Sequence, residues 1–119
     1  MLVVDDSEIF QGVAASLISA AEGLRQVGVA ASGEEAIRLL PELKPDLVLL
    51  DVHMPGLGGL ETACVIRREH PETVVILVSA DPAGVAPDAP PTGAAAILSK
   101  ADLSHRLLEE LWLTHLARA

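Results

Sequence analysis

Three aspartates directly follow runs of apolar residues, an unusual position for a charge. Asp5 and Asp6 follow "LVV", and Asp51 follows "LVLL". Ser79 and Lys100 close two later apolar stretches, "TVVILVS" and "AAAILSK". Two like charges 4 Å apart repel by about 4 kcal/mol at an effective dielectric of 20. If the fold brings the three carboxylates together, a divalent cation would relieve that repulsion, and oxygen-only ligands favour Mg²⁺.

The same five residues suit phosphoryl transfer. A carboxylate can act as a nucleophile and form an aspartyl phosphate, and we assign that role to Asp51. Lys100 would supply positive charge to a phosphoryl oxygen, and the hydroxyl of Ser79 would donate a hydrogen bond to another. Mg²⁺ held by one or two carboxylates commonly serves phosphate chemistry, which agrees with this assignment.

Each aspartate also has a purely structural interpretation. Asp5 and Asp6 could cap the first helix, because "DDSE" has the spacing of a capping box from Asp5 to Glu8. Asp51 could begin a turn, because Pro55 and several glycines follow it. The functional interpretation is favoured only by the joint placement of the acids, the serine and the lysine at strand ends.

Apolar runs alternate with helical patterns along the chain, which predicts a parallel sheet covered by helices. The predicted strands are 2–4, 24–31, 47–50, 73–79 and 94–98, and the predicted helices are 7–21, 34–40, 59–70 and 102–117. Pro41 is expected to stop the second helix. Ile9, Val13 and Leu17 are expected to share the apolar face of the first helix.

The expected fold is α/β, a flavodoxin-like doubly wound five-stranded parallel sheet of order 2-1-3-4-5 with helices on both faces. Residues 81–93 contain four prolines, so a fourth helix there should be short or irregular. Ligands of such sheets bind outside the carboxyl ends of the strands, where the strand order reverses. The five polar residues are expected to converge on that rim.

Composition excludes several classes of protein. The 119 residues suit one domain, residues 1–119, and a hydrophobic content of 50% argues against disorder. A net charge of −9 disfavours direct binding to nucleic acid or to an anionic membrane. No apolar run approaches the roughly 18 residues that span a bilayer, so we expect a soluble, cytoplasmic domain. The single cysteine, Cys64, excludes an internal disulfide.

Four segments carry a resemblance to a known family. They are "VVDDSEIF" (3–10), "PDLVLLDVHMPGLGGLE" (45–61), "VVILVSA" (74–80) and "GAAAILSK" (93–100). With these segments the chain resembles the receiver domain of bacterial two-component response regulators along nearly all its length. The resemblance implies a signalling domain rather than an enzyme. Asp51 would take a phosphoryl group from a sensor histidine kinase or a phosphotransfer protein and so switch an output surface.

The resemblance also implies roles for the neighbouring residues. Asp6, Asp51 and the backbone carbonyl of His53 would ligate Mg²⁺, with Asp5 holding one of the metal's waters or lying close by. Ser79 and Lys100 would contact the phosphoryl oxygens. A homodimer is one role open to Trp112 on the last helix, although core packing is the favoured one.

Three features depart from the family pattern. Ile97 stands where the family usually has an aromatic residue that moves inward on phosphorylation. Ala101 stands where a proline often follows the lysine, which makes a cis peptide bond there unfavourable by about 3 kcal/mol. The segment 81–93 is short and rich in proline. These departures affect the output mechanism more than the phosphorylation chemistry.

Alternative functions remain open. One is a receiver-like module for protein interaction that works without phosphorylation. An aspartate-nucleophile phosphohydrolase is disfavoured, because it needs an acid two residues beyond the nucleophile, where His53 stands. The chain itself is either a stand-alone receiver or a fragment of a longer regulator, with a slight preference for transcription regulators that carry a C-terminal DNA-binding domain.

Overall fold

A computed structural model describes residues 1–80 and 94–116 of the chain, with side chains up to Thr114. Five parallel strands form one sheet in the order β2-β1-β3-β4-β5, as the sequence predicted. The strands are β1 (Leu2–Val4), β2 (Gly28–Ala30), β3 (Leu47–Asp51), β4 (Val74–Ser79) and β5 (Ala96–Ser99). The segment 81–93, where a short or irregular helix was expected, lies outside the described residues.

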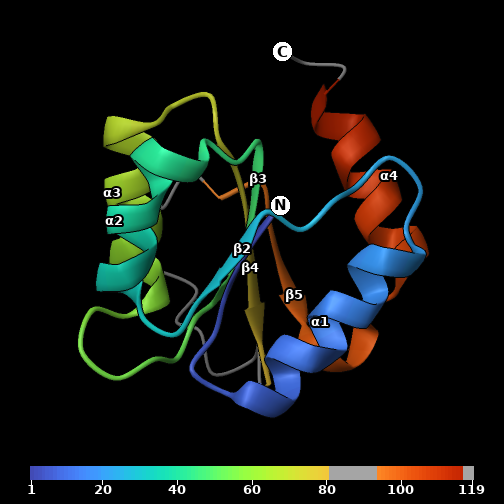
Figure 1. Cartoon of the computed structure of the whole chain (residues 1–119), viewed down its shortest axis with the longest axis horizontal. Coiled ribbons are helices and arrows are strands. Elements are labelled where there is room, and N and C mark those ends of the chain that lie inside the picture. The colour runs from blue at the N-terminus through green and yellow to red at the C-terminus, as the bar shows by residue number, and fades with distance from the viewer. Residues whose placement is uncertain (81–93, 117–119) are drawn as a thin grey trace.

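Helices cover both faces of the sheet (Figure 1). On one face lie α1 (Glu8–Ala20) and α4 (His105–Leu116), and on the other lie α2 (Gly33–Leu43) and α3 (Gly59–Glu69). Side chains of β3 alternate between two cores, with Val48 and Leu50 facing α2 and α3 and Leu47 and Leu49 facing α1 and α4. All of β3 is therefore buried, which explains its continuous apolar run.

Strand register brings the predicted rim residues together. Val4 pairs with Leu50, so Asp5, the next residue, lies beside Asp51. Ser79 pairs with Ser99, and Lys100 follows directly. The carboxyl ends of β1, β3, β4 and β5 thus meet at one edge of the sheet.

The start of α1 does not form the capping box from Asp5 to Glu8 that the sequence offered as an alternative role for Asp5. Ser7, not Asp5, is the N-cap, and its hydroxyl accepts a hydrogen bond from Phe10 N at 3.3 Å. Asp5 instead accepts a hydrogen bond from Ser7 N at 2.8 Å through Oδ1. The aspartate therefore shapes the turn before the helix and leaves its second oxygen at the rim.

The buried face of α1 was predicted only in part: Leu17 packs against the core, but Ile9 and Val13 are exposed. Ile9 is 84% exposed and Val13 47% exposed, whereas the buried residues are Phe10, Ala14 and Ile18. Both series have the i, i+4 spacing of one helix face, and both are apolar. Periodicity alone could not choose between them, and the structure leaves an apolar pair on the surface.

Two element boundaries in the first half of the chain differ from the prediction. The strand expected at 24–31 shortens to Gly28–Ala30, preceded by hydrogen bonds from Val27 N to Met1 O at 2.9 Å and from the Met1 amino group to Arg25 O at 2.6 Å. The helix α2 continues through Pro41 to Leu43: the proline lacks an N–H and so gives up one hydrogen bond, but the last turn still closes through Lys44 N, which donates to Leu40 O at 2.9 Å.

The last helix starts later than predicted. Lys100–Asp102 forms a separate 3-10 turn, η2, and α4 begins at His105. The hydroxyl of Ser104 accepts a hydrogen bond from Leu107 N at 3.1 Å, which fixes the start of the helix. Trp112 packs against the core beside α1, which agrees with the core role favoured for it. Among the described residues, no helix has the length and apolar character needed to cross a membrane.

Candidate functional site

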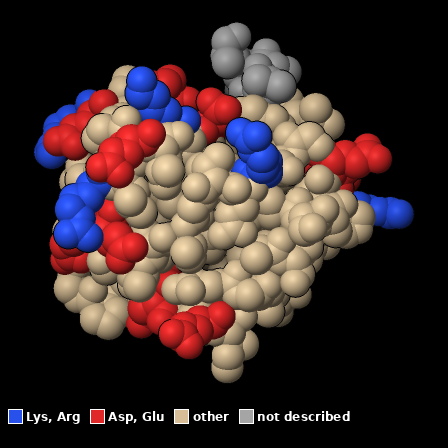
Figure 2. Space-filling model, in the orientation of Figure 1, with Lys and Arg blue, Asp and Glu red and all other residues tan. Residues whose placement is uncertain are grey.

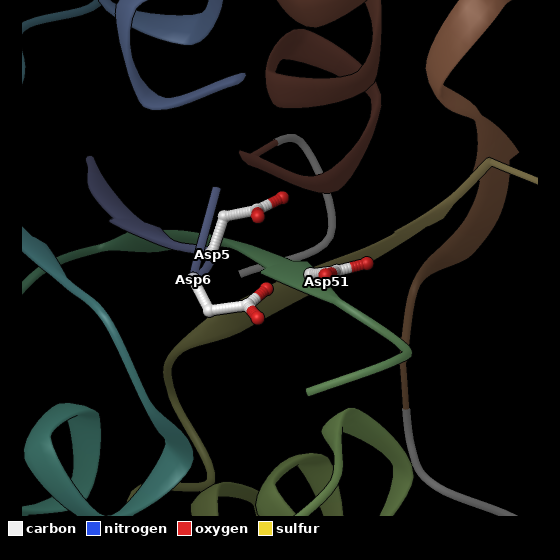
Figure 3. Close-up of side chains that lie close together, drawn as sticks. All are labelled: Asp5, Asp6 and Asp51. Carbon is white, nitrogen blue, oxygen red and sulfur yellow. The ribbon is translucent and has the colours of Figure 1, made fainter. Parts of the chain in front are cut away.

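Three carboxylates meet at the carboxyl edge of the sheet (Figure 3). Asp5 and Asp6 follow β1 and Asp51 ends β3, and one oxygen of each lies within 4.8 Å of the others. Asp5 and Asp51 are buried, whereas Asp6 is exposed. The structure therefore brings together the three acids that the sequence singled out.

Backbone contacts from two neighbouring elements hold Asp5 in place. Its N–H donates a hydrogen bond to Ala30 O at the end of β2, at 3.0 Å. Its carbonyl accepts one from Gln11 Nε2 on α1, at 2.6 Å. The carboxylate of Asp5 thus sits on a backbone fixed from both sides.

Lys100 reaches two of the acids. Its Nζ lies 2.7 Å from Asp5 Oδ2 and 3.7 Å from Asp51 Oδ1. Asp5 Oδ2 is buried and has no hydrogen-bond partner within the described part of the chain, so this ion pair is its compensation. The ammonium also lies 4.2 Å from the centroid of the Phe10 ring, a favourable cation–π contact. One ammonium faces three carboxylates, so an excess of negative charge remains.

The pKa of Asp51 is raised by its surroundings. Burial raises the pKa of its carboxyl above the ordinary value, and the negative charge of Asp5 raises it further. Lys100 and a hydrogen bond from His53 N, at 3.4 Å, act in the opposite direction. Ionising Asp51 in this pocket therefore costs more than ionising an exposed aspartate, and added positive charge would lower that cost. Clustered carboxylate oxygens are the donors that a hard divalent cation such as Mg²⁺ prefers, so the residues fit that ion.

Ser79 and His53 complete the predicted set. Ser79 is buried at the end of β4, one residue after Val78, which pairs with Asp51. His53 is exposed and lies in the loop after β3, two residues from Asp51. The role of its carbonyl as a metal ligand stays a prediction.

Close packing fixes the loop that follows Asp51. Gly59 N donates to Val52 O at 2.9 Å, and a Cβ at Gly59 would overlap the carbonyl oxygen of Asp51. Glu34, from α2, accepts a hydrogen bond from Leu57 N at 2.9 Å. Sequence reasoning missed Glu34 and the contact of Phe10 with Lys100. Neither contact is marked by a sequence motif, because the two partners lie far apart in the chain, 23 residues in the case of Glu34 and Leu57.

Surface charge agrees with a cation site at this edge. Figure 2 shows acidic side chains gathered at the lower edge of the visible face, where the strands end in Figure 1. Elsewhere on this face, on the side of α2 and α3, acids and bases are interspersed. Because acidic side chains predominate at this edge, it should attract cations.

Comparison with known proteins gives one consistent family. A sequence model of the response regulator receiver domain matches residues 1–111. Among solved structures, the signal receiver domain of NarL from Mycobacterium tuberculosis superposes with a TM-score of 0.81 at 32% identity, covering 95% of this chain and 91% of that one. The response regulator domain of Thermotoga maritima CheB superposes with a TM-score of 0.75 at 30% identity, covering 99% and 92%.

Curated relatives share part of the sequence. Response regulator GacA of Pseudomonas viridiflava is 44% identical over 79 residues, which cover 66% of this chain and 37% of that protein. A protein-glutamate methylesterase/protein-glutamine glutaminase of Trichodesmium erythraeum is 41% identical over 80 residues, 67% of this chain and 23% of that protein. These matches span about a third or less of the relatives' own length.

Proposed function

The chain belongs to the response regulator receiver domain family of two-component signalling, and on that premise we propose that Asp51 accepts a phosphoryl group. The observation that carries the proposal is the cluster of Asp5, Asp6 and Asp51, in which Lys100 pairs with Asp5 and with the buried Asp51. Receiver domains are in general signalling domains rather than enzymes. The phosphoryl group is then a signal and not an intermediate of a metabolic reaction.

We propose that Asp6, Asp51 and the carbonyl of His53 hold Mg²⁺, with Asp5 next to them. The ion, when bound, neutralises carboxylate charge and stabilises the charge that develops on the phosphoryl oxygens. This assignment is supported by the oxygen donors within 4.8 Å of one another and by the raised pKa of Asp51.

Asp51, Lys100 and Ser79 are proposed to promote phosphoryl transfer through their positions. Asp51 Oδ attacks phosphorus, the bond from phosphorus to the donor nitrogen breaks, and the donor leaves with that electron pair. Lys100 Nζ, now 3.7 Å from Asp51 Oδ1, is near enough to pair with a phosphoryl oxygen. The hydroxyl of Ser79 donates to another oxygen. Phosphoryl transfer needs little more than such positioning and charge stabilisation.

The proposed donor is the phosphohistidine of a sensor histidine kinase or of a phosphotransfer protein. Such a donor must approach over the rim, next to the first turn of α1. Ile9 and Val13 expose an apolar pair on that helix, 84% and 47% exposed. An apolar strip of this kind suits a helix of the partner, so we propose that the donor docks there.

The proposed output lies in a switched surface. Phosphorylation adds nearly two negative charges beside Ser79, which can bias a two-state element. Because the matched relatives are longer than this chain, we propose that a further domain, such as a DNA-binding one, reads the switch. A receiver-like module that needs no phosphate is the second candidate. Ile97 favours it, because an exposed aliphatic side chain cannot act as the family's aromatic switch.

Acetyl phosphate tests the proposed function directly. Incubated with acetyl phosphate and Mg²⁺, the protein should gain the mass of one phosphoryl group, and a chelator should prevent the gain. Intact-mass spectrometry measures both. Unchanged mass, together with an unchanged amide spectrum when beryllofluoride and Mg²⁺ are added, would favour the phosphate-independent module instead.

Replacing Lys100 with glutamine should separate metal binding from phosphorylation. Mg²⁺ affinity should stay the same or rise slightly, because a competing positive charge is removed. The labelling rate should fall by about 100-fold, as when one preorganised donor to a developing anion is lost. Calorimetric Mg²⁺ titration and time-resolved mass spectrometry measure the two effects.

Lys44→Gln is the matched control for Lys100→Gln. Lys44 is exposed at the C-terminal end of α2, away from the carboxyl edge of the sheet. Both the affinity and the rate should match the wild type in this variant. Equal labelling rates in Lys100→Gln and Lys44→Gln would remove Lys100 from the proposed mechanism.

A further inference from the structure

The loop between β3 and α3 is held at its far end by two carboxylates. Gly58 N donates to Glu61 Oε2 at 2.7 Å, and Leu57 N donates to Glu34 Oε1 at 2.9 Å. Glu61 belongs to the first turn of α3 and makes a local contact. Glu34 comes from α2, 23 residues away, and so ties the loop to a different helix.

The packing around Glu34 is built for close approach. Gly56 has a φ of +76°, and a Cβ there would lie 2.9 Å from Glu34 Oε1. A Cβ at Gly33 would overlap Thr62 Oγ1 of α3 and lie 2.8 Å from Leu57 O. The start of α2 therefore lies so close to the loop and to Thr62 of α3 that there is little room for a Cβ at Gly33 or Gly56.

The charge state of Glu34 suits this contact. The hydrogen bond from Leu57 N lowers the pKa of the Glu34 carboxyl below its ordinary value. The acceptor is therefore ionised at neutral pH. Hydrogen bonds to an ionised acceptor are stronger than those between neutral groups.

At its near end, the loop is fixed by the sheet. Val52 N donates to Val78 O at 2.9 Å, continuing the pairing of β3 with β4. His53 follows directly, with its N–H on Asp51 Oδ1 at 3.4 Å. The peptide that carries the His53 carbonyl thus lies between an anchor at the sheet and the anchor at Glu34.

We propose that Glu34 is a positioning residue for the metal site. Its carboxylate holds the loop 52–58 so that the His53 carbonyl faces the same point as the carboxylates of Asp6 and Asp51. This inference rests on the function proposed above. Without Glu34 the loop would occupy the binding-competent arrangement for only a fraction of the time, and the apparent dissociation constant rises by the inverse of that fraction.

Mg²⁺ affinity of the full chain, measured by calorimetry, tests the role of Glu34. Glu34→Ala should bind Mg²⁺ about fivefold more weakly, because the released loop would be in the binding-competent arrangement only about a fifth of the time. Glu34→Gln should stay within about twofold of the wild type, because its amide oxygen still accepts from Leu57 N. Glu35→Ala removes the same charge from the same helical turn and should leave the affinity unchanged.

The variant Glu34→Asp tests whether the length of the side chain or its negative charge matters for Mg²⁺ binding. It keeps a negative charge at the start of α2, but the shorter side chain does not span the distance to Leu57 N. Its affinity should fall as in Glu34→Ala, and it serves in place of that variant if the alanine protein does not fold. Amide hydrogen exchange in metal-free protein gives a second readout: Leu57 N–H should exchange faster in the alanine and aspartate variants only.

The outcomes are distinguishable. Wild-type Mg²⁺ affinity in Glu34→Asp, with faster exchange at Leu57, would overturn the inference, because the loop would be loosened with no effect on the site. Equal losses in Glu34→Ala and Glu35→Ala would also overturn it, since charge alone would explain them. A wild-type protein that binds no Mg²⁺ would instead overturn the proposed function and the inference with it.

Discussion

Replacing Asp51 with asparagine should abolish labelling by acetyl phosphate and, in metal-free buffer, make the protein more stable. The first effect follows because an amide oxygen is a far weaker nucleophile than a carboxylate. The second follows because the pKa of Asp51 is raised by burial and by the charge of Asp5, so its ionised form is held at a cost. We expect a gain of about 1 kcal/mol, within the usual range for a single substitution.

The stability gain should depend on pH in a defined direction. Below the ordinary pKa of an aspartate, 3.8, Asp51 is protonated in both the folded and unfolded states, so it costs nothing. Between that value and the raised folded pKa, the folded state binds more protons, and the stability of the wild type falls as pH rises. Above the folded pKa, the full cost is present. The advantage of Asp51→Asn should therefore be absent near pH 3, grow with pH and then level off.

Urea unfolding in the presence of a chelator, repeated across this pH range, measures the difference. Asp6→Asn is the control, because Asp6 belongs to the same cluster but is exposed, so its replacement should change stability less. Adding Mg²⁺ should shrink the difference between Asp51→Asn and the wild type, since only the wild type retains the full ligand set. An Asp51→Asn protein that is still labelled at the wild-type rate would refute the nucleophile assignment.

The rim could be predicted from the sequence because a parallel sheet converts strand order into position. Once β1 and β3 are neighbours, residues that follow their apolar runs must lie side by side, as Asp5 and Asp51 do. Lys100 was predictable for the same reason, as the residue that follows β5. The chemistry proposed for the rim stays a prediction, based on the few roles that suit clustered acids with one lysine.

Other features depend on tertiary contacts that leave no sequence pattern. In α1 the series of Ile9 and the series of Phe10 both have helical spacing, and only the packing against the sheet decided between them. Likewise, the sequence separation of 23 residues between Glu34 and Leu57 gives no pattern from which their hydrogen bond could be predicted. Pro41 was taken for a helix stop because it lacks an N–H, but the loss of that one hydrogen bond does not end α2, whose last turn closes through Lys44 N and Leu40 O.

Gly59→Ala should be the most destabilising of the glycine substitutions at the site. A Cβ at Gly59 would overlap Asp51 O and lie 2.7 Å from Val52 Cα and 2.8 Å from the carbonyl carbon of Asp51. All three are backbone atoms at the end of the central strand, and they are fixed by pairing with β4. A clash with backbone cannot be relieved by rotating a side chain, so α3 or the end of β3 must move. We expect a loss of about 3 kcal/mol, at the upper end for overpacking.

Gly12→Ala is the control for Gly59→Ala. Gly12 is exposed in α1, and no atom lies within 4 Å of a Cβ built there, so alanine should raise stability by about 0.5–1 kcal/mol through helix propensity. Urea unfolding of both variants measures the opposite signs. Gly59→Ala should also weaken Mg²⁺ binding in the protein that remains folded, because moving the carbonyl of Asp51 displaces its carboxylate. A Gly59→Ala protein as stable as the wild type would show that α3 does not pack closely against the end of β3.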